Sequence, residues 1–330
     1  MAGNKRLYIG TDSGLTMMSD DGSGWRHERD ALAGKFVRAM ISVRGRSAAY
    51  ACIVREGLYA TWDGGKTWRL ALAGNVHSVA VDPNDVNVIY AGTEPVSLFR
   101  STDAGRSWTE LTALKNQPES VTEKWWFPQY PHESHVLSIF VDWHAPRVLA
   151  VGLEHGGILR SIDGGERWED LSEGIEYIDI PTVKGDPLDP ELSYTATARG
   201  FYRSDQNGRN WVFSERGLNR SYFHDLVVVP GNPPALFLTT ANGTPPAWAR
   251  KEKAQSAIFR SLDFGVTWRQ LTGGLPESME RMIWNLAIDP DEPNHLYAGT
   301  GEAQGQRSEN VSSRGGVWVS KDRGDRWQTI

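Results

Sequence analysis

Histidine, carboxylate and arginine side chains recur at the ends of short apolar runs along this 330-residue chain. One set stands at the start of alternating apolar runs: Arg38, His77, His135, Asp179, His224, Asp225, Trp284 and Asn285. A second set stands at the end of other apolar runs: Asp12, Glu56, Glu94, Glu154, His155, Arg199 and Glu302. Imidazole and carboxylate groups bind transition metals and transfer protons in hydrolysis.

The first chemistry that these residues suggest is metal binding. His77, His135 and His224 are the candidate ligands, with glutamates bonded to the other ring nitrogens. The sequence has no H-x-x-x-H or H-E-x-x-H stretch, so the three imidazoles have to come from separate strands. A divalent transition metal is therefore the candidate cofactor. The alternative is that the same histidines line a water-filled channel and form ordinary hydrogen bonds there.

The second chemistry is acid–base catalysis by carboxylates. Glycoside cleavage needs two carboxyl groups about 5 to 10 Å apart. Glu94, Glu154, Glu302 and Asp179 form a set that contains such a pair if the fold brings them together. The candidate catalytic residues are accordingly His77, His135, His224, Glu94, Glu154 and Glu302.

Aromatic and basic residues near the same positions predict a binding surface. Trp125, Trp126, Phe127 and Tyr130 lie in one long loop and suit stacking on a sugar or another flat ligand. The alternative is that this loop packs over the site as a plug. The candidate ligand-binding residues are Arg38, Trp125, Trp126, Tyr130, His155, Asp179, Arg199, Trp248 and Trp284.

A repeated turn shows which elements must position these side chains. Seven copies of Ser/Thr-x-Asp-x-Gly-x-x-Trp end at Trp25, Trp68, Trp108, Trp168, Trp211, Trp268 and Trp327. The first copy is one residue short, and the fifth has Gln206 in place of the aspartate. Asp and Ser side chains bond backbone groups within a turn, and Gly adopts the positive φ that the turn demands. These aspartates are therefore predicted to be structural.

Four short strands recur around each turn, with a period of about 40 residues that is typical of a propeller blade. We call them A to D in chain order. The sequence thus predicts an all-β fold: a single seven-bladed β-propeller over residues 1–330, with four-stranded blades. The chain opens on strand B, so either the first blade has three strands or, as we expect, the sequence is a truncated part of a longer one.

In a closed propeller, strand A begins and strand B ends at the same mouth of the central channel. The long insertions, residues 113–134, 241–256 and 302–314, all fall on that face. Long loops on one rim of a rigid scaffold commonly carry function. We therefore expect the site at this mouth.

The seven turns resemble the Asp-boxes of bacterial-neuraminidase-type (BNR) repeats, and the resemblance covers nearly the whole chain. Similar propellers include sialidases, xyloglucan-type endoglucanases, sortilin-like receptor domains and photosystem II assembly factors. The Phe/Tyr-Arg-Ile-Pro stretch of sialidases is missing near the start of this sequence. Xyloglucanases of this type resemble two facing propellers, whereas this chain accounts for one. The resemblance implies a glycosyl-hydrolase-like or a binding propeller.

Composition narrows the partners and the compartment. The net charge of -6 and the pI near 5.8 argue against nucleic acid. There is no apolar stretch for export or for a membrane span, which predicts a cytoplasmic protein without a membrane partner. The single cysteine, Cys52, lies in an apolar run and is predicted to be a buried structural thiol.

Together these features predict a propeller that binds a small molecule or an oligosaccharide at the mouth with the long loops. Hydrolytic or lytic chemistry, either metal-dependent or carried by carboxylates, is the leading expectation. The alternative is a non-catalytic assembly or interaction propeller that holds a protein partner through its insertion loops.

Overall fold

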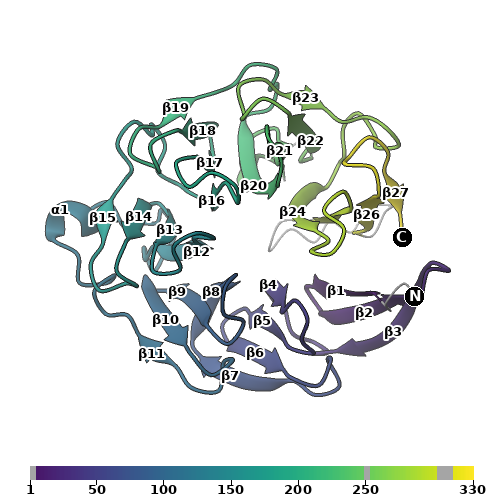
Figure 1. Ribbon diagram of the computed structural model, residues 1–330, viewed down its shortest axis with the longest axis horizontal. Helices are drawn as coiled ribbons and strands as arrows, with labels where there is room; N and C mark the ends of the chain where they lie inside the picture. The colour runs from purple at the N-terminus through teal and green to yellow at the C-terminus, as the bar shows by residue number, and fades with distance from the viewer. Residues whose placement is uncertain (1–4, 249–252, 303–314) are drawn as a thin grey trace. The chain divides into compact units, whose positions relative to one another are not determined.

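The structure is a computed structural model that describes residues 5–248, 253–302 and 315–330. The described residues form seven antiparallel sheets in succession along the chain, the arrangement of a seven-bladed β-propeller (Figure 1). This confirms the predicted fold class. The chain divides into two compact units, Met1–Asp170 and Leu171–Ile330. None of the described helices is long and apolar enough to cross a membrane.

The first unit holds four of the seven sheets and one short helix. Its elements are β1 (Lys5–Thr11), β2 (Gly14–Asp20), β3 (Trp25–Ala31), β4 (Val37–Ser42), β5 (Ala49–Ile53), β6 (Gly57–Thr61), β7 (Arg69–Ala73), β8 (Asn75–Val81), β9 (Ile89–Glu94), β10 (Ser97–Ser101), β11 (Thr109–Glu110), α1 (Glu119–Thr122), β12 (His135–Val141), β13 (Leu149–Glu154), β14 (Gly157–Ser161) and β15 (Glu169–Asp170). The first sheet has three described strands, which correspond to B, C and D. The other three sheets have the predicted four strands.

The second unit holds three four-stranded sheets. Its elements are β16 (Thr182–Gly185), β17 (Ser193–Thr197), β18 (Gly200–Ser204), β19 (Val212–Phe213), β20 (Tyr222–Val229), β21 (Ala235–Ala241), α2 (Pro245–Ala247), β22 (Ala257–Ser261), β23 (Arg269–Gln270), β24 (Met282–Ile288), β25 (Leu296–Gly301), β26 (Val317–Ser320) and β27 (Gln328–Thr329). Of the predicted insertions, 113–134 carries α1 and 241–256 carries α2. Residues 249–252, and 303–314 of the third insertion, lie outside the described residues.

Neighbouring blades within a unit pack closely through their A and B strands. A Cβ atom placed on Gly92 of β9 would lie 2.6 Å from Val136 of β12, so only glycine permits this approach. The Ser78 hydroxyl donates a 2.7 Å hydrogen bond to the Val136 carbonyl between the same two blades. In the second unit the Leu286 backbone N–H donates to the Asp225 carboxylate at 2.7 Å. Asp225 therefore ties β20 to β24.

The repeated turns are built by hydrogen bonds between their own residues. In the third turn the Ser101 hydroxyl donates to Asp103 at 2.8 Å and accepts from Gly105 N–H at 2.8 Å, while Asp103 accepts from Ser107 N–H at 2.8 Å. In the fifth turn Ser204 still accepts from Gly208 N–H, at 3.1 Å, although Gln206 replaces the aspartate. The serine alone can therefore close the turn.

These bonds stabilise the charged form of the turn aspartates. Hydrogen bonds from Arg167, followed by that from Ser161, lower the pKa of Asp163 to about 2. Bonds from Thr67 and Ser107 likewise lower the pKa values of Asp63 and Asp103. The carboxylates of these turns thus accept hydrogen bonds within their own turns, in agreement with the predicted structural role.

The motif tryptophans pack between blades. The Trp268 ring lies 4.8 Å from Phe201 of the preceding blade at an interplanar angle of 76°, an edge-to-face contact. Trp68 and Tyr8 form a similar pair at 6.4 Å and 84°. Cys52 is fully buried in β5, and burial raises the pKa of its thiol to about 12. It is a structural thiol, as predicted.

The irregular fifth turn provides a test of this turn chemistry. We expect Gln206→Asp to raise the free energy of unfolding at pH 7 by ~0.5–1.5 kcal/mol, the net value of a hydrogen bond. Because such an aspartate has a folded pKa below its ordinary value of 3.8, the gain is present above about pH 4 and is lost as the pH falls toward 2. Urea unfolding at both pH values measures it.

Gln206→Asn is the matched control, since it offers an oxygen of similar reach that does not titrate. Its effect relative to the unaltered chain should be the same at both pH values. A gain for Gln206→Asp that survives unchanged at about pH 2 would contradict the proposed role of the charge.

Candidate functional site

Most of the A strands contain a one- or two-residue bulge near their start, and these bulges hold several of the predicted site residues. The register with strand B skips Arg38 in β4, His77 in β8 and Leu137 in β12. In the second unit it skips His224 and Asp225 in β20, and Trp284 in β24. A bulge removes a residue from the ladder and redirects its side chain, and bulges are common beside functional sites. The bulges thus position these side chains at the edge where A begins and B ends, which we call the loop rim.

In the first unit the loop rim brings together two histidines and two glutamates. The rings of His77 and His135 lie 4.0 Å apart at an interplanar angle of 41°. His77 Nε2 lies 2.8 Å from a Glu94 carboxylate oxygen, and His135 Nε2 contacts Glu154. Both imidazoles are only 4% exposed, whereas the glutamate side chains reach solvent. We call these four residues the histidine–glutamate cluster.

Burial sets the charge of this cluster. Desolvation by burial, together with smaller contributions from the neighbouring His135 and Arg38, lowers the pKa of His77 to about 2. Burial opposes ionisation of Glu154, but its contact with His135 and the charges of His155 and Arg38 outweigh burial and lower its pKa. At neutral pH the cluster therefore contains a neutral His77 and a charged Glu154.

Arg38 completes the electrostatics of the cluster. Its side chain reaches solvent, yet the surrounding protein desolvates the guanidinium and lowers its pKa. The negative charges of Glu154 and Glu94 raise the pKa of Arg38, so both carboxylates lie within electrostatic reach of the guanidinium. The Asn75 amide also donates to Glu94, at 2.8 Å. Glu94 thus interacts with His77, Asn75 and Arg38, and Glu154 interacts with His135 and Arg38.

The 113–134 loop covers the cluster with one aromatic ring and exposes others. Phe127 lies 5.7 Å from His135 and 5.6 Å from His155, ring centre to ring centre. Trp126 stacks on His132 at 5.0 Å and stays 55% exposed, and Tyr130 is 89% exposed. The loop is thus partly a cover and partly an exposed aromatic surface, which combines the two alternatives drawn from the sequence.

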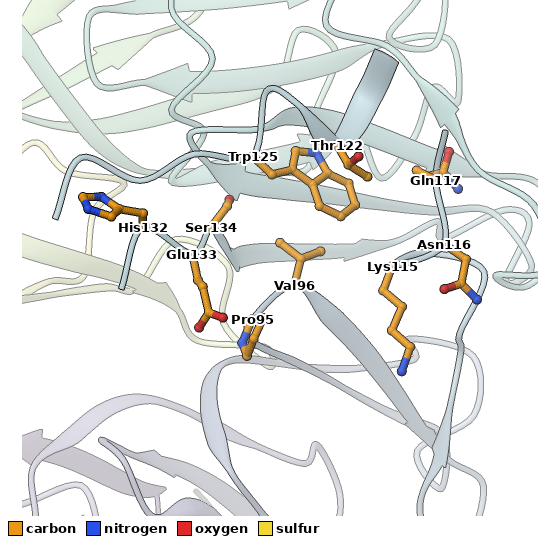
Figure 2. Close-up of a pocket in the computed structure, with 10 residues that line it drawn as sticks. All are labelled: Pro95, Val96, Lys115, Asn116, Gln117, Thr122, Trp125, His132, Glu133 and Ser134. Carbon is orange, nitrogen blue, oxygen red and sulfur yellow. The ribbon is translucent and has the colours of Figure 1, made fainter. Parts of the chain in front are cut away.

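An open pocket of about 740 Å³ lies between this loop and the β9–β10 turn. Figure 2 shows Trp125 and Val96 facing each other across it, with Glu133 on one side and Asn116 on the other. The remaining lining residues are Pro95, Lys115, Gln117, Thr122, His132 and Ser134. Trp125 is half-buried and its indole N–H has no hydrogen-bond partner among the described residues. The pocket therefore offers one aromatic wall and several polar groups.

The second unit holds the other predicted residues in a separate aromatic group. His224 lies 5.0 Å from Trp284, edge to face, and its Nδ1 is 3.3 Å from the Tyr222 hydroxyl. Trp248 contacts Trp284 at 5.8 Å and donates its indole N–H to two backbone carbonyls. Since His224 belongs to this unit and packs among aromatic rings, its role as a third metal ligand beside His77 and His135 stays a prediction.

Three further predicted residues of the second unit have partners there. The Arg199 guanidinium lies 4.6 Å from the centre of the Tyr177 ring, and Glu302 pairs with Arg281 at 3.2 Å. The Asp179 carbonyl accepts a hydrogen bond from Ala198 N–H at 3.1 Å. A catalytic role for Glu302 and binding roles for Arg199 and Asp179 also stay predictions.

Sequence reasoning named the histidine–glutamate cluster but missed other residues, among them Arg281, which pairs with Glu302 in the second unit. Arg281 precedes an A strand as the predicted residues do, so its position was an available signal. Phe127 was seen as part of an aromatic loop, but nothing in the sequence indicated that it would cover His135. The pocket residues Asn116 and Glu133 likewise carry no motif, because the conformation of the loop alone places them.

Comparison with known proteins finds similarity in sequence to xyloglucanases. No family model matches the chain. Its sequence is 24% identical over 261 residues to xyloglucanase Xgh74A of Acetivibrio thermocellus, covering 63% of this chain and 28% of that protein. It is 23% identical over 275 residues to a Paenibacillus xyloglucanase, covering 69% of this chain and 25% of the other. The chain thus spans only about a quarter of the length of these curated relatives.

Solved structures support the same fold. The GH74 enzyme of Niastella koreensis matches with a TM-score of 0.68 at 19% identity, over 90% of this chain and 45% of that one. YCF48 bound to a D1 peptide matches with a TM-score of 0.57 at 17% identity, over all of this chain and 84% of that one. The chain is therefore a seven-bladed β-propeller with sequence similarity to xyloglucanases.

The burial of the cluster predicts its chemical reactivity. In EDTA-treated protein, diethyl pyrocarbonate should modify the exposed His144 rapidly and leave His77 and His135 almost unmodified, as mass spectrometry of peptides would show. Phe127→Ala should increase modification of His135 several-fold because it removes the covering ring. Trp126→Ala is the control and should leave His135 protected. Rapid modification of His135 in the unaltered chain would contradict the described burial.

Proposed function

We propose that this chain is a glycan-binding propeller with hydrolytic chemistry, and that it takes a xyloglucan-type oligosaccharide in the pocket beside Trp125. The observation that carries the proposal is the open pocket of about 740 Å³ on the loop rim. Pockets of several hundred Å³ suit ligands of this size. The aromatic face of Trp125 suits the apolar face of a sugar ring, and Asn116 and Gln117 supply polar groups.

The pocket also adjoins the histidine–glutamate cluster through the backbone. Pro95 lines the pocket, and the preceding residue, Glu94, contacts His77. Ser134 lines the pocket, and the following residue, His135, contacts Glu154. A sugar in the pocket would therefore lie beside two wall segments that also carry the cluster. This proximity supports a link between binding and chemistry.

Glu133 is the carboxylate that we assign to the acid–base step, because it is the carboxylate among the described residues that line the pocket. Glu94, one residue from the pocket wall, is the second carboxyl group. Glycoside hydrolysis uses such a pair, one group donating a proton to the leaving oxygen and the other activating water. The sequence similarity to xyloglucanases over 63% and 69% of the chain supports this class of substrate.

Binding provides the first test of this proposal. Trp125→Ala should weaken binding of a xyloglucan oligosaccharide about tenfold, which corresponds to the ~1.4 kcal/mol of one aromatic contact. The matched control is Trp143→Ala, a half-exposed tryptophan in the β12–β13 turn of the same unit, at the opposite rim. Isothermal titration calorimetry measures both variants.

Equal losses in the two variants, or no binding by the unaltered chain, would contradict the proposed pocket. The second candidate function, binding of a protein segment, is supported by the exposed rings of Trp126 and Tyr130 on the same loop. That function is favoured if the chain binds no oligosaccharide and a Trp126→Ala, Tyr130→Ala variant loses a protein partner.

Turnover provides the second test. Glu133→Gln should lower kcat on a xyloglucan oligosaccharide by at least about 100-fold, the usual contribution of a general acid or base, while binding changes little. Glu123→Gln is the control, because Glu123 is an exposed glutamate of the same loop that does not line the pocket. Release of reducing ends measures the rate. Full activity of Glu133→Gln would remove its catalytic role and leave the binding proposal intact.

A further inference from the structure

We propose that His77, His135 and Glu94 form a binding site for one divalent transition-metal ion of the zinc type. These three side chains each present one ligand atom, and the three atoms lie within 4.8 Å of one another. They come from three strands in two adjacent blades, β8, β9 and β12. The set differs from the three histidines predicted from the sequence, because a glutamate supplies the third ligand.

Unused nitrogen atoms are the main evidence for a ligand. Both imidazoles are 4% exposed, and the Nδ1 atom of each has no hydrogen-bond partner among the described residues. The Nε2 atoms lie against carboxylates but lack the geometry of a hydrogen bond. Buried polar atoms without partners are costly and rare in folded proteins. A metal ion would satisfy one nitrogen of each ring.

The donor set determines which kind of metal fits. Two imidazoles and one carboxylate suit zinc and related ions, whereas calcium and magnesium prefer sites made of oxygen. Three protein ligands leave a coordination position for water or substrate, as in catalytic zinc sites. The cluster also contains outer partners that orient the ligands: Glu154 contacts His135, and Asn75 donates to Glu94.

The local charge also permits a cation. The carboxylates of Glu94 and Glu154 face the site, and Arg38 and His155 are the basic groups within electrostatic reach. Two carboxylates against one permanent positive charge leave net negative charge for a divalent ion to compensate.

A second group of possible ligands, Asp289, Glu292 and His295, lies in the second unit. Its aspartate already accepts the backbone N–H groups of Asp291 and Glu292, at 2.9 and 3.1 Å. The same turn occurs at Asp82 and Asp142. That group is therefore explained by its turn, and it supplies a matched control.

Metal binding itself does not depend on the proposed function, although its catalytic use does. A metal with an open position lowers the pKa of bound water and supplies a nucleophile for hydrolysis. Glu94 would then act through the metal, and the proposed glycan hydrolysis would be sensitive to EDTA. Zinc content and zinc affinity are measured without sugar, so failure of one proposal leaves the other standing.

The test is equilibrium dialysis of the EDTA-treated chain against Zn²⁺, with elemental analysis. We expect about one zinc per chain. His77→Gln and His135→Gln should lose it, and His295→Gln should keep it. Glu154→Gln should weaken binding by about 10- to 100-fold, because Glu154 orients His135 without binding the metal. Circular dichroism identifies variants that fold, and zinc should raise the Tm of the unaltered chain but not of the folded histidine variants.

Three results would overturn the proposal: no stoichiometric zinc in the unaltered chain, zinc retained by a folded His77→Gln, His135→Gln double variant, or zinc lost in His295→Gln. If the histidine variants do not fold, Co²⁺ added to the unaltered chain decides the question. Visible absorption typical of a four- or five-coordinate site supports the proposal, and the weak spectrum of the hydrated ion overturns it.

Discussion

The bulge near the start of strand A is the constraint on which the site depends. In a regular strand, neighbouring side chains alternate between two faces, and both faces of a propeller blade pack against other blades. At the bulges, Arg38, His77 and Trp284 leave the ladder, so polar or large side chains enter the strand near its start. In β8 the next residue, Ser78, resumes the register opposite Gly92 and bonds the adjacent blade.

His77 lies in such a bulge, whereas His135 pairs with Glu154 at the start of β12, and both imidazoles are buried. Their rings lie 4.0 Å apart, and the glutamates at the ends of β9 and β13 contact them. The cover, Phe127, belongs to the loop that also forms the pocket with Trp125 and Glu133. The pocket and the cluster thus share two chain segments, since Pro95 follows Glu94 and Ser134 precedes His135.

The sequence predicted what depends on local chemistry or on topology. The turn motif defined the blades because its serine, aspartate and glycine bond one another, and strand order then placed His77, His135, Glu94 and Glu154 at one edge. It did not predict the pocket or the position of Phe127, since the 113–134 loop is shaped by tertiary contacts. It named Glu94 near the histidines but did not show which imidazole it would contact, because strand alternation alone does not show which side chains a bulge redirects.

The most direct test of this account is an anomalous difference map from a crystal of the chain soaked in zinc, recorded at the zinc absorption edge. The account predicts a peak between the ring nitrogens of His77 and His135 and the Glu94 carboxylate, at about 2.0 to 2.2 Å from each ligand atom. A well-ordered map without a peak there, with both imidazoles bonded only to carboxylates, would contradict it.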